Sequence, residues 1–372
     1  ANTLNLGTDG NWAVKKDSLL AYNDENNNFK PLPFEFERAS SATVVNKEGL
    51  IETVGNDIPR IDFSDDANGA LKLEPQRTNL LTYSEDFSQW NNTDITLTNG
   101  QLAPDGTLNA TKVSGVIGSS LMTLGNVSST DSRSIYARTV SGTGVAKLMS
   151  YFENTNNTFT LTEEWQRFEL TSSSSTGGAN FYIDFRDITD QTLSEFIIWG
   201  AQSEQGSYAT SYISTQGSTV TRLADECNNG GNDQVINSTE GVLYAEISTL
   251  VNGADVRISV SDGGGTNKVE IEWDALANTI KAFMNTDGSI TTSSYNQTLY
   301  LKIAVSYKLN NFKMYINGFL IDTDITASNV SGLNQLNFAK SIGGNNFYGN
   351  VKDVRLYNTA LTDSELQQLT TI

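Results

Sequence analysis

Histidine is absent from the 372-residue chain, and cysteine occurs once, as Cys227. Without histidine the chain lacks the most common general base and the most common transition-metal ligand, so Ser-His-Asp and Cys-His catalysis and histidine-ligated zinc are excluded. A single cysteine cannot form an intrachain disulfide, and we interpret it as a free thiol in a polar linker. No run of about 20 apolar residues is present, so the sequence predicts no membrane partner.

Basic residues are also scarce, with 24 Lys and Arg against 43 Asp and Glu and a formal net charge of -19. Nucleic-acid binding requires clusters of Lys and Arg, so this balance argues against a nucleic-acid partner. An acidic surface is compatible with neutral glycans, with divalent cations, or with solubility alone. The first residues, 1–7, show no basic region followed by an apolar run, and the pattern therefore predicts no signal peptide.

The chain is rich in short alternating segments that are separated by Gly, Asn or Asp, which is typical of β-sandwiches and barrels. The clearest hairpin joins 312–316 to 319–322 through Asn317-Gly318, a dipeptide that favours a type I′ turn. One short helix is predicted at 362–369, where Thr362 and Glu365 have the spacing of a capping box. The sequence predicts an all-β fold.

The composition and the strand pattern divide the chain into four parts. They are an N-terminal β-rich region (1–82), an antiparallel β-sandwich (83–215), a polar linker or crossing strand (216–238) and a second antiparallel β-sandwich (239–372). Such a length usually forms two or three domains. Region 1–82 has few strands for its length, so we expect it to pack on a neighbouring part, another subunit or a larger assembly.

The last part carries four characteristic segments: 313–318, 342–344, 347–358 and 360–366. In their order, a hairpin, a Gly-led strand, Tyr-Asn and a short helix, they resemble the laminin-G-like branch of the concanavalin A-like lectin and glucanase superfamily. The resemblance covers about a third of the chain and implies a lectin-like jelly roll. Residues 79–90 and 199–202 make the second part similar to galactose-binding-like jelly rolls, such as carbohydrate-binding modules of families four, nine and twenty-two.

Three further segments, 38–43, 71–81 and 199–213, resemble fibre, tail and head-appendage proteins of tailed-bacteriophage virions. This resemblance implies a protein that is assembled in the host cytoplasm and exposed extracellularly on the particle, which agrees with the predicted lack of a signal peptide. It also implies other virion proteins as partners of the N-terminal region. We expect a homo-oligomer, a trimer, because weak single sites for glycans require avidity.

Aromatic side chains are the candidates for stacking on sugar rings, although an aromatic residue in an alternating strand is more often part of the core. Tyr295 and the pair Phe347-Tyr348 lie in polar segments and not in alternating strands, so they are better candidates than the others. The candidate ligand-binding residues are Trp90, Tyr151, Tyr182, Tyr295, Phe347 and Tyr348, with Phe152, Trp165 and Trp273 as weaker candidates.

Acidic residues suggest two further sites. Both resembled families often hold a structural Ca²⁺, for which Glu85, Asp86 and Asp262 are candidates, with turn stabilisation as the alternative role. Glu270, Glu272 and Asp274 alternate along one strand face, in a pattern similar to the carboxylates of glucanases. Their residue types depart from that pattern, and we interpret them as a solvated strand face.

We therefore expect a non-enzymatic phage virion protein, a fibre or decoration appendage, that presents lectin-like domains to host-surface or mucosal glycans. No cofactor other than the calcium is expected. One alternative is a decoration protein of the capsid or tail that binds no ligand. Another is a glycosidase or depolymerase that uses Glu270, Glu272 and Asp274. A bacterial cell-surface glycan-binding protein is a further alternative.

Overall fold

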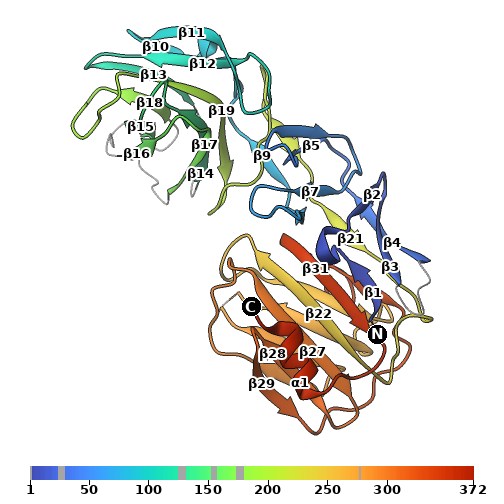
Figure 1. The fold of residues 1–372 in the computed structure, drawn as a ribbon. Helices are drawn as coiled ribbons and strands as arrows, with labels where there is room; N and C mark the ends of the chain where they lie inside the picture. Colours follow the sequence, from blue (N-terminus) through green and yellow to red (C-terminus); the bar gives the residue numbers. More distant parts are fainter. Residues whose placement is uncertain (1, 24–29, 125–130, 152–156, 173–179, 276–277) are drawn as a thin grey trace.

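The computed structural model describes residues 2–23, 30–124, 131–151, 157–172, 180–275 and 278–372. The predicted all-β class is confirmed: the described residues form antiparallel sheets and sandwiches, with one short α-helix, α1 (Asp363–Thr370). Figure 1 shows two sandwiches at opposite ends of the molecule, with N-terminal strands between them and beside the lower one. No helix in these ranges combines the length and apolar character that crossing a membrane requires.

The first sandwich consists of two five-stranded sheets. From edge to edge, one sheet contains β10 (Asn91–Thr93), β13 (Ser119–Leu124), β18 (Asn180–Phe185), β15 (Gly144–Ser150) and β16 (Thr158–Leu161). The other contains β11 (Thr96–Gln101), β12 (Ala110–Ser114), β19 (Glu195–Gln205), β14 (Asp131–Arg138) and β17 (Gln166–Ser172). Alternate apolar side chains of both sheets form one buried core between them.

The second sandwich pairs a five-stranded sheet with a larger one. The smaller sheet is β26 (Gly288–Thr291), β25 (Ile280–Met284), β24 (Lys268–Trp273), β23 (Val256–Ser261) and β30 (Gln335–Asn337). The C-terminal strands of the larger sheet are β31 (Gly349–Tyr357), β22 (Glu240–Thr249), β27 (Leu301–Lys308), β28 (Phe312–Ile316) and β29 (Phe319–Asp324). Helix α1 covers part of the outer face of this sheet, where Leu366 belongs to one buried cluster with Tyr244 and Tyr315.

N-terminal strands extend the larger sheet beyond β31. The strands concerned are β1 (Asn2–Leu6), β2 (Ala13–Lys15), β3 (Ser18–Asn23), β4 (Lys30–Glu37), β7 (Arg60–Asp62), β8 (Ala70–Leu73) and β21 (Glu226–Asn228). Both β1 and β8 pair with β31, while β21 pairs with β4 at the far edge. The four-part division of the chain stays a prediction, but hydrogen bonds between strands join its first, third and fourth parts.

Two short ladders complete the described strands. One is the hairpin of β5 (Ala42–Val45) and β6 (Ile51–Val54), and the other pairs β9 (Arg77–Asn79) with β20 (Val220–Arg222). The turn of this hairpin is 46–49, where the backbone N–H of Gly49 donates to the carbonyl of Asn46 at 3.0 Å. Cys227, which was expected in a polar linker, lies buried in β21, and burial raises the pKa of its thiol.

A buried ionic cluster links β7 and the residues after β4 and β8 to β20 and the residue before β21, and we call it the junction cluster. It consists of Arg38, Arg60, Glu74, Arg222 and Asp225, all 2% exposed or less. Asp225 accepts from Arg38 Nη1 at 2.9 Å and from Arg60 Nη2 at 2.5 Å, while Glu74 accepts from Arg60 and Arg222 at 2.8 Å each. Glu74 also accepts from the Ser211 hydroxyl at 2.6 Å, which links the cluster to the segment after β19.

Candidate functional site

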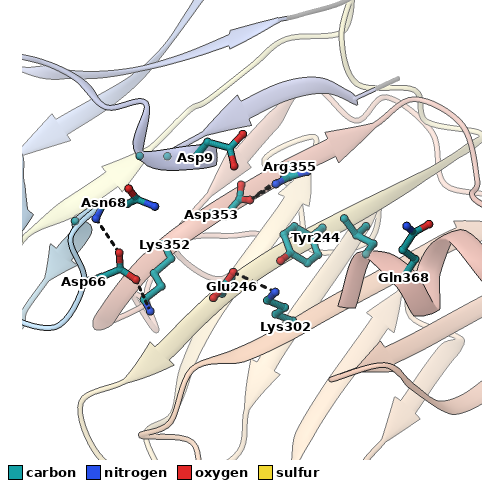
Figure 2. Close-up of a pocket in the computed structure, with 14 residues that line it drawn as sticks. Asp9, Asp66, Asn68, Tyr244, Glu246, Lys302, Lys352, Asp353, Arg355 and Gln368 are labelled. Carbon is teal, nitrogen blue, oxygen red and sulfur yellow. Dashed lines mark hydrogen bonds and ion pairs between the residues drawn. The ribbon is translucent and has the colours of Figure 1, made fainter. Parts of the chain in front are cut away.

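A polar pocket of about 380 Å³ opens on the outer face of the larger sheet (Figure 2). Its floor follows from the period-two alternation of β22, in which Leu243 and Ala245 face the core while Tyr244 and Glu246 face outward. On the neighbouring strand β31, Arg355 lies opposite Tyr244 and Asp353 lies opposite Glu246. Two carboxylates therefore sit side by side across the sheet.

Arg355 and Thr8 hold Asp353 in place. The Arg355 guanidinium donates to Asp353 Oδ2 from Nη2 at 2.6 Å and from Nε at 2.9 Å, and the Thr8 hydroxyl donates to Oδ1 at 2.7 Å. Burial raises the pKa of Asp353 in spite of these partners. The same guanidinium lies 5.5 Å from the centre of the Tyr244 ring. The paired charges fix the geometry of this part of the floor.

Lys302 of β27 lies opposite Glu246, on the side away from Asp353, so the three side chains form a row across the three neighbouring strands. Its ammonium lies 4.0 Å from Glu246 and donates to the carbonyl of Thr371 at 3.0 Å. The end of α1 contributes Gln368 and Leu369 as a side wall. An ammonium, a carboxylate and an amide thus line one side of the pocket.

Two N-terminal loops form the opposite wall. One is the 3₁₀ turn η1 (Thr8–Gly10), and the other is the turn 66–69. Asp66 pairs with Lys352 at 2.8 Å, and the hydrogen bond from Lys352 lowers the pKa of Asp66. Gly7 has φ 75°, and a Cβ there would lie 2.6 Å from the carbonyl oxygen of Lys352, so the close approach of this loop to β31 requires glycine.

The lining determines what the pocket can bind. Four carboxylates, three cationic side chains and two amides surround it, while apolar surface is minor; the residues concerned are Asp9, Asp66, Asn68, Glu246, Lys302, Lys352, Asp353, Arg355 and Gln368. A volume of about 380 Å³ is within the range of small-molecule sites, roughly 300–1,000 Å³. Such a lining suits a small ligand with many hydroxyl groups, because hydroxyls both donate and accept hydrogen bonds.

Four of the six aromatic candidates, Trp90, Tyr151, Tyr182 and Phe347, are buried. Trp90 is 4% exposed, donates its Nε1 hydrogen to the carbonyl of Tyr83 at 3.0 Å, and packs edge-on against core rings. Phe347 is 1% exposed and packs on Trp273, which is itself in the core. Both rings lie in segments between strands, and their burial comes from packing against other core rings.

Tyr151 and Tyr182 are buried beneath arginines. The Arg133 guanidinium lies 3.7 Å from the centre of the Tyr151 ring, and the Arg186 guanidinium lies 3.8 Å from that of Tyr182. A ring face that carries a guanidinium at this distance cannot also carry a sugar. Among the weaker candidates, Phe152 lies outside the described residues.

Tyr295 and Tyr348 remain predictions. Both are half-buried and pack against the core of the second sandwich, and burial raises the pKa of each phenol. Neither belongs to the lining of the pocket in Figure 2. Trp165 is also half-buried, with the Arg138 guanidinium 5.3 Å from its ring.

The acidic face of β24 is covered, which corrects the expectation of a solvated face. Glu270 is fully buried: its Oε1 pairs with Arg257 at 2.9 Å, and its Oε2 accepts from the backbone N–H of Ser341 at 2.9 Å. Glu272 is paired with Arg257 at 2.7 Å, and Lys281 donates to Asp274. These carboxylates compensate basic neighbours and cross-link the strands of the smaller sheet.

The calcium candidates have other partners. Asp86 caps the 3₁₀ turn η3 (Phe87–Gln89) by accepting from the backbone N–H of Ser88 at 3.2 Å. Asp262 accepts from the backbone N–H of Gly264 at 2.7 Å, and Glu85 accepts from three neutral side chains. Within the described ranges, no group of three or more Asp, Glu or Cys side chains could hold a metal ion. The geometry of these acids fits turn and loop stabilisation.

Sequence reasoning missed the floor of the pocket. The outward residues Tyr244 and Glu246 alternate visibly with apolar neighbours in the sequence, so their exposure on one face could be predicted. Their partners Asp353 and Arg355 are more than 100 positions away in sequence, and Thr8 is still further. Only the pairing of the strands brings these residues together.

The unit on which the pocket lies resembles a known family. Residues 228–367 match the family model for the concanavalin A-like lectin/glucanases superfamily. This segment contains β22 to β31 and most of α1, and hence the floor of the pocket. The two loops that form the opposite wall, at Thr8–Gly10 and 66–69, lie outside it. No curated protein matches the chain in sequence.

Among solved structures, the CBM40 of the Ruminococcus gnavus IT-sialidase bound to α2,3-sialyllactose is 15% identical, over 39% of this chain and 94% of its own, with a TM-score of 0.32. Domain 4 of AbnA, a GH43 extracellular arabinanase from Geobacillus stearothermophilus in complex with arabinotriose, is 14% identical, over 45% of this chain and 84% of its own, with a TM-score of 0.33. Trypanosoma rangeli sialidase is 9% identical, over 95% of this chain and 65% of its own, with a TM-score of 0.31.

Proposed function

We propose that the protein is a non-catalytic glycan-binding protein and that the pocket in Figure 2 receives the sugar. The observation that carries this proposal is the position of the pocket: its floor is built from strands of the segment that matches the lectin and glucanase family model. The lining agrees with it, because Glu246 can accept from sugar hydroxyls while Lys302 and Gln368 can donate to them.

A single pocket of this kind binds weakly. Polar contacts to a sugar replace contacts to water, so the net free energy of binding is small. Several copies on one assembly would convert weak sites into strong attachment, since the later binding events become intramolecular. A trimeric appendage would supply this multivalency.

We further propose that the protein is a fibre or decoration appendage of a tailed-phage virion, assembled in the host cytoplasm and exposed on the particle. The support for this proposal is the resemblance of segments 38–43, 71–81 and 199–213 to such proteins. In the fold, 71–81 and 199–213 are in contact: the backbone N–H of Leu80 donates to the carbonyl of Ser203 at 2.8 Å, and Ser211 donates to Glu74. The partners would be other virion proteins and host-surface or mucosal glycans.

The test of glycan binding is an array of host-surface and mucosal glycans probed with the protein on multivalent beads. Glu246→Gln is the diagnostic variant, because it removes the carboxylate charge from the floor with little change of shape. Glu240→Gln is the matched control: Glu240 lies on the same strand, pairs with Lys308 at 3.1 Å, and is outside the pocket.

We expect Glu246→Gln to weaken binding to the best glycan about tenfold, or about 1.4 kcal/mol, as for the loss of one charged hydrogen bond. Glu240→Gln should bind like the parent. A folded parent protein that binds no glycan on the array would contradict the proposal, as would equal binding by both variants. Immunogold electron microscopy of a particle carrying the protein tests the virion role separately.

A further inference from the structure

The N-terminal wall of the pocket in Figure 2 carries a negative charge without a cationic partner. Of its two carboxylates, Asp66 pairs with Lys352 at 2.8 Å. The other, Asp9 in the turn η1, lines the same pocket and is exposed. Within the described ranges, no Lys or Arg side chain forms an ion pair with Asp9.

The floor of the pocket has no spare cation for this carboxylate. Arg355 donates two hydrogen bonds to Asp353, and Lys302 lies 4.0 Å from Glu246. Each of the three cationic side chains in the lining thus has a carboxylate within 4.0 Å. The four carboxylates outnumber the three cations by one, and Asp9 is the one that is left over.

The charge of Asp9 acts on the floor and can also be reached by a ligand. Burial raises the pKa of Asp353, and the negative charge of Asp9 adds to that rise. The Asp353 oxygens already accept from Arg355 and Thr8, whereas the Asp9 carboxylate is exposed at the mouth of the pocket. A cationic group on a ligand would therefore meet Asp9 and not Asp353.

We propose that Asp9 determines the specificity of this pocket, which selects a sugar that bears a free amine over neutral and N-acetylated sugars. This inference rests on the proposed function, because it names the class of sugar that the same pocket receives. An amino sugar brings hydroxyl groups for Glu246, Lys302 and Gln368, and its ammonium group pairs with Asp9. It balances the surplus charge, which a neutral sugar leaves unbalanced.

This specificity comes from the N-terminal region and not from the lectin-like segment. Asp9 lies far outside residues 228–367, the part of the chain that matches the family model. It reaches the pocket because β1 pairs with β31, and because the hydroxyl of the neighbouring Thr8 donates to Asp353 at 2.7 Å. A lectin-like segment without these N-terminal residues would keep the floor of the pocket and lose the selecting charge.

The test compares amino sugars with their uncharged counterparts in saturation-transfer NMR titrations at about pH 6, where a primary amine is protonated. The sugars are glucosamine, galactosamine and mannosamine, each beside its N-acetylated form and its parent hexose. The N-acetyl group is larger than the amine and the hydroxyl of the hexose is of similar size. A preference for the amine over both therefore reports charge and not bulk.

Asp9→Asn is the diagnostic variant, and Asp17→Asn is its matched control. Asp9 and Asp17 are both exposed, with φ angles of 54° and 63°, and asparagine tolerates this left-handed conformation as well as aspartate does. Asp17 does not line the pocket. Both variants remove one negative charge from the chain, so only the position of the charge differs between them.

We expect the parent to bind at least one amino sugar about threefold to fivefold more tightly than both of its uncharged counterparts, as for one partly exposed ion pair. Asp9→Asn should bring this ratio close to one and leave the Kd of the parent hexose unchanged. The unchanged Kd would show that the shape of the pocket is intact. Asp17→Asn should keep the ratio of the parent protein.

Three results would overturn the inference: equal binding of amino and uncharged sugars by the parent, a preference that persists in Asp9→Asn, or silence of all the amino sugars with folded protein. Failure of the proposed function is a different outcome, since the glycan array would then show no binding, or binding that Glu246→Gln leaves unchanged. Array binding that depends on Glu246, without a preference for amines, would keep the pocket as a glycan site and refute only the role of Asp9.

Discussion

Replacing Asp225 by alanine should destabilise the protein strongly, because Asp225 is central to the junction cluster. Its carboxylate is 1% exposed and accepts from Arg38, from Arg60 and from the backbone N–H of Glu74. The cluster has three guanidiniums and two carboxylates, so the variant leaves three buried positive charges with one negative charge. Breaking a buried ion pair by removing one partner costs about 3–5 kcal/mol.

Urea unfolding, followed by circular dichroism and tryptophan fluorescence, measures this loss. The matched control is Asp233→Ala, since Asp233 is exposed and its loss should change the free energy of unfolding by less than about 0.5 kcal/mol. Asp225→Ala should lower it by about 3 kcal/mol or more. A loss below about 1 kcal/mol would show that the three arginines are satisfied without Asp225, and the reasoning would be refuted.

Two further predictions concern acidity and the core. Burial alone would raise the pKa of Glu74, but the charges of Arg222 and Arg60 outweigh it and hold that pKa well below 4.5. The ionised form of Glu74 therefore stabilises the fold above about pH 4.5, and this contribution is lost as the pH falls toward the depressed pKa. The difference in Tm between the parent and Glu74→Gln should shrink over that range of pH. A constant difference would contradict the assignment. Trp90→Ala should cost about 3–5 kcal/mol in urea unfolding, while binding to the glycan array stays unchanged in the folded variant. A stable variant that loses glycan binding would make Trp90 a ligand platform.

Local signals in the sequence predicted local structure well. Asn317 and Gly318 have φ angles of 51° and 86°, the positive values that the dipeptide indicated for the turn between β28 and β29. Thr362 and Glu365 form the capping box of α1. Both features depend on residues within a few positions of one another, so they can be predicted from the local sequence.

Features that depend on distant residues could not be predicted. The alternation around Glu270 shows two faces, but not that the segment at Ser341 would cover the acidic one. The sequence around an aromatic residue gives no sign of whether an arginine lies over its ring, as Arg133 does over Tyr151. The walls of the pocket in Figure 2 were missed for the same reason, since Thr8 approaches Asp353 only through the pairing of β1 with β31.

The pairing of β1 with β31 has a consequence for how the chain is made. Asn5 lies opposite Arg355, so the two partners are 350 positions apart. During synthesis β1 and β8 leave the ribosome long before β31, the strand with which they pair. The first sandwich can therefore fold before β1 and β8 have their partner. Contacts of such long range form slowly. A fragment that begins near residue 239 would expose the edge of β31 that β1 and β8 cover, and an uncovered edge of this kind promotes association with other chains.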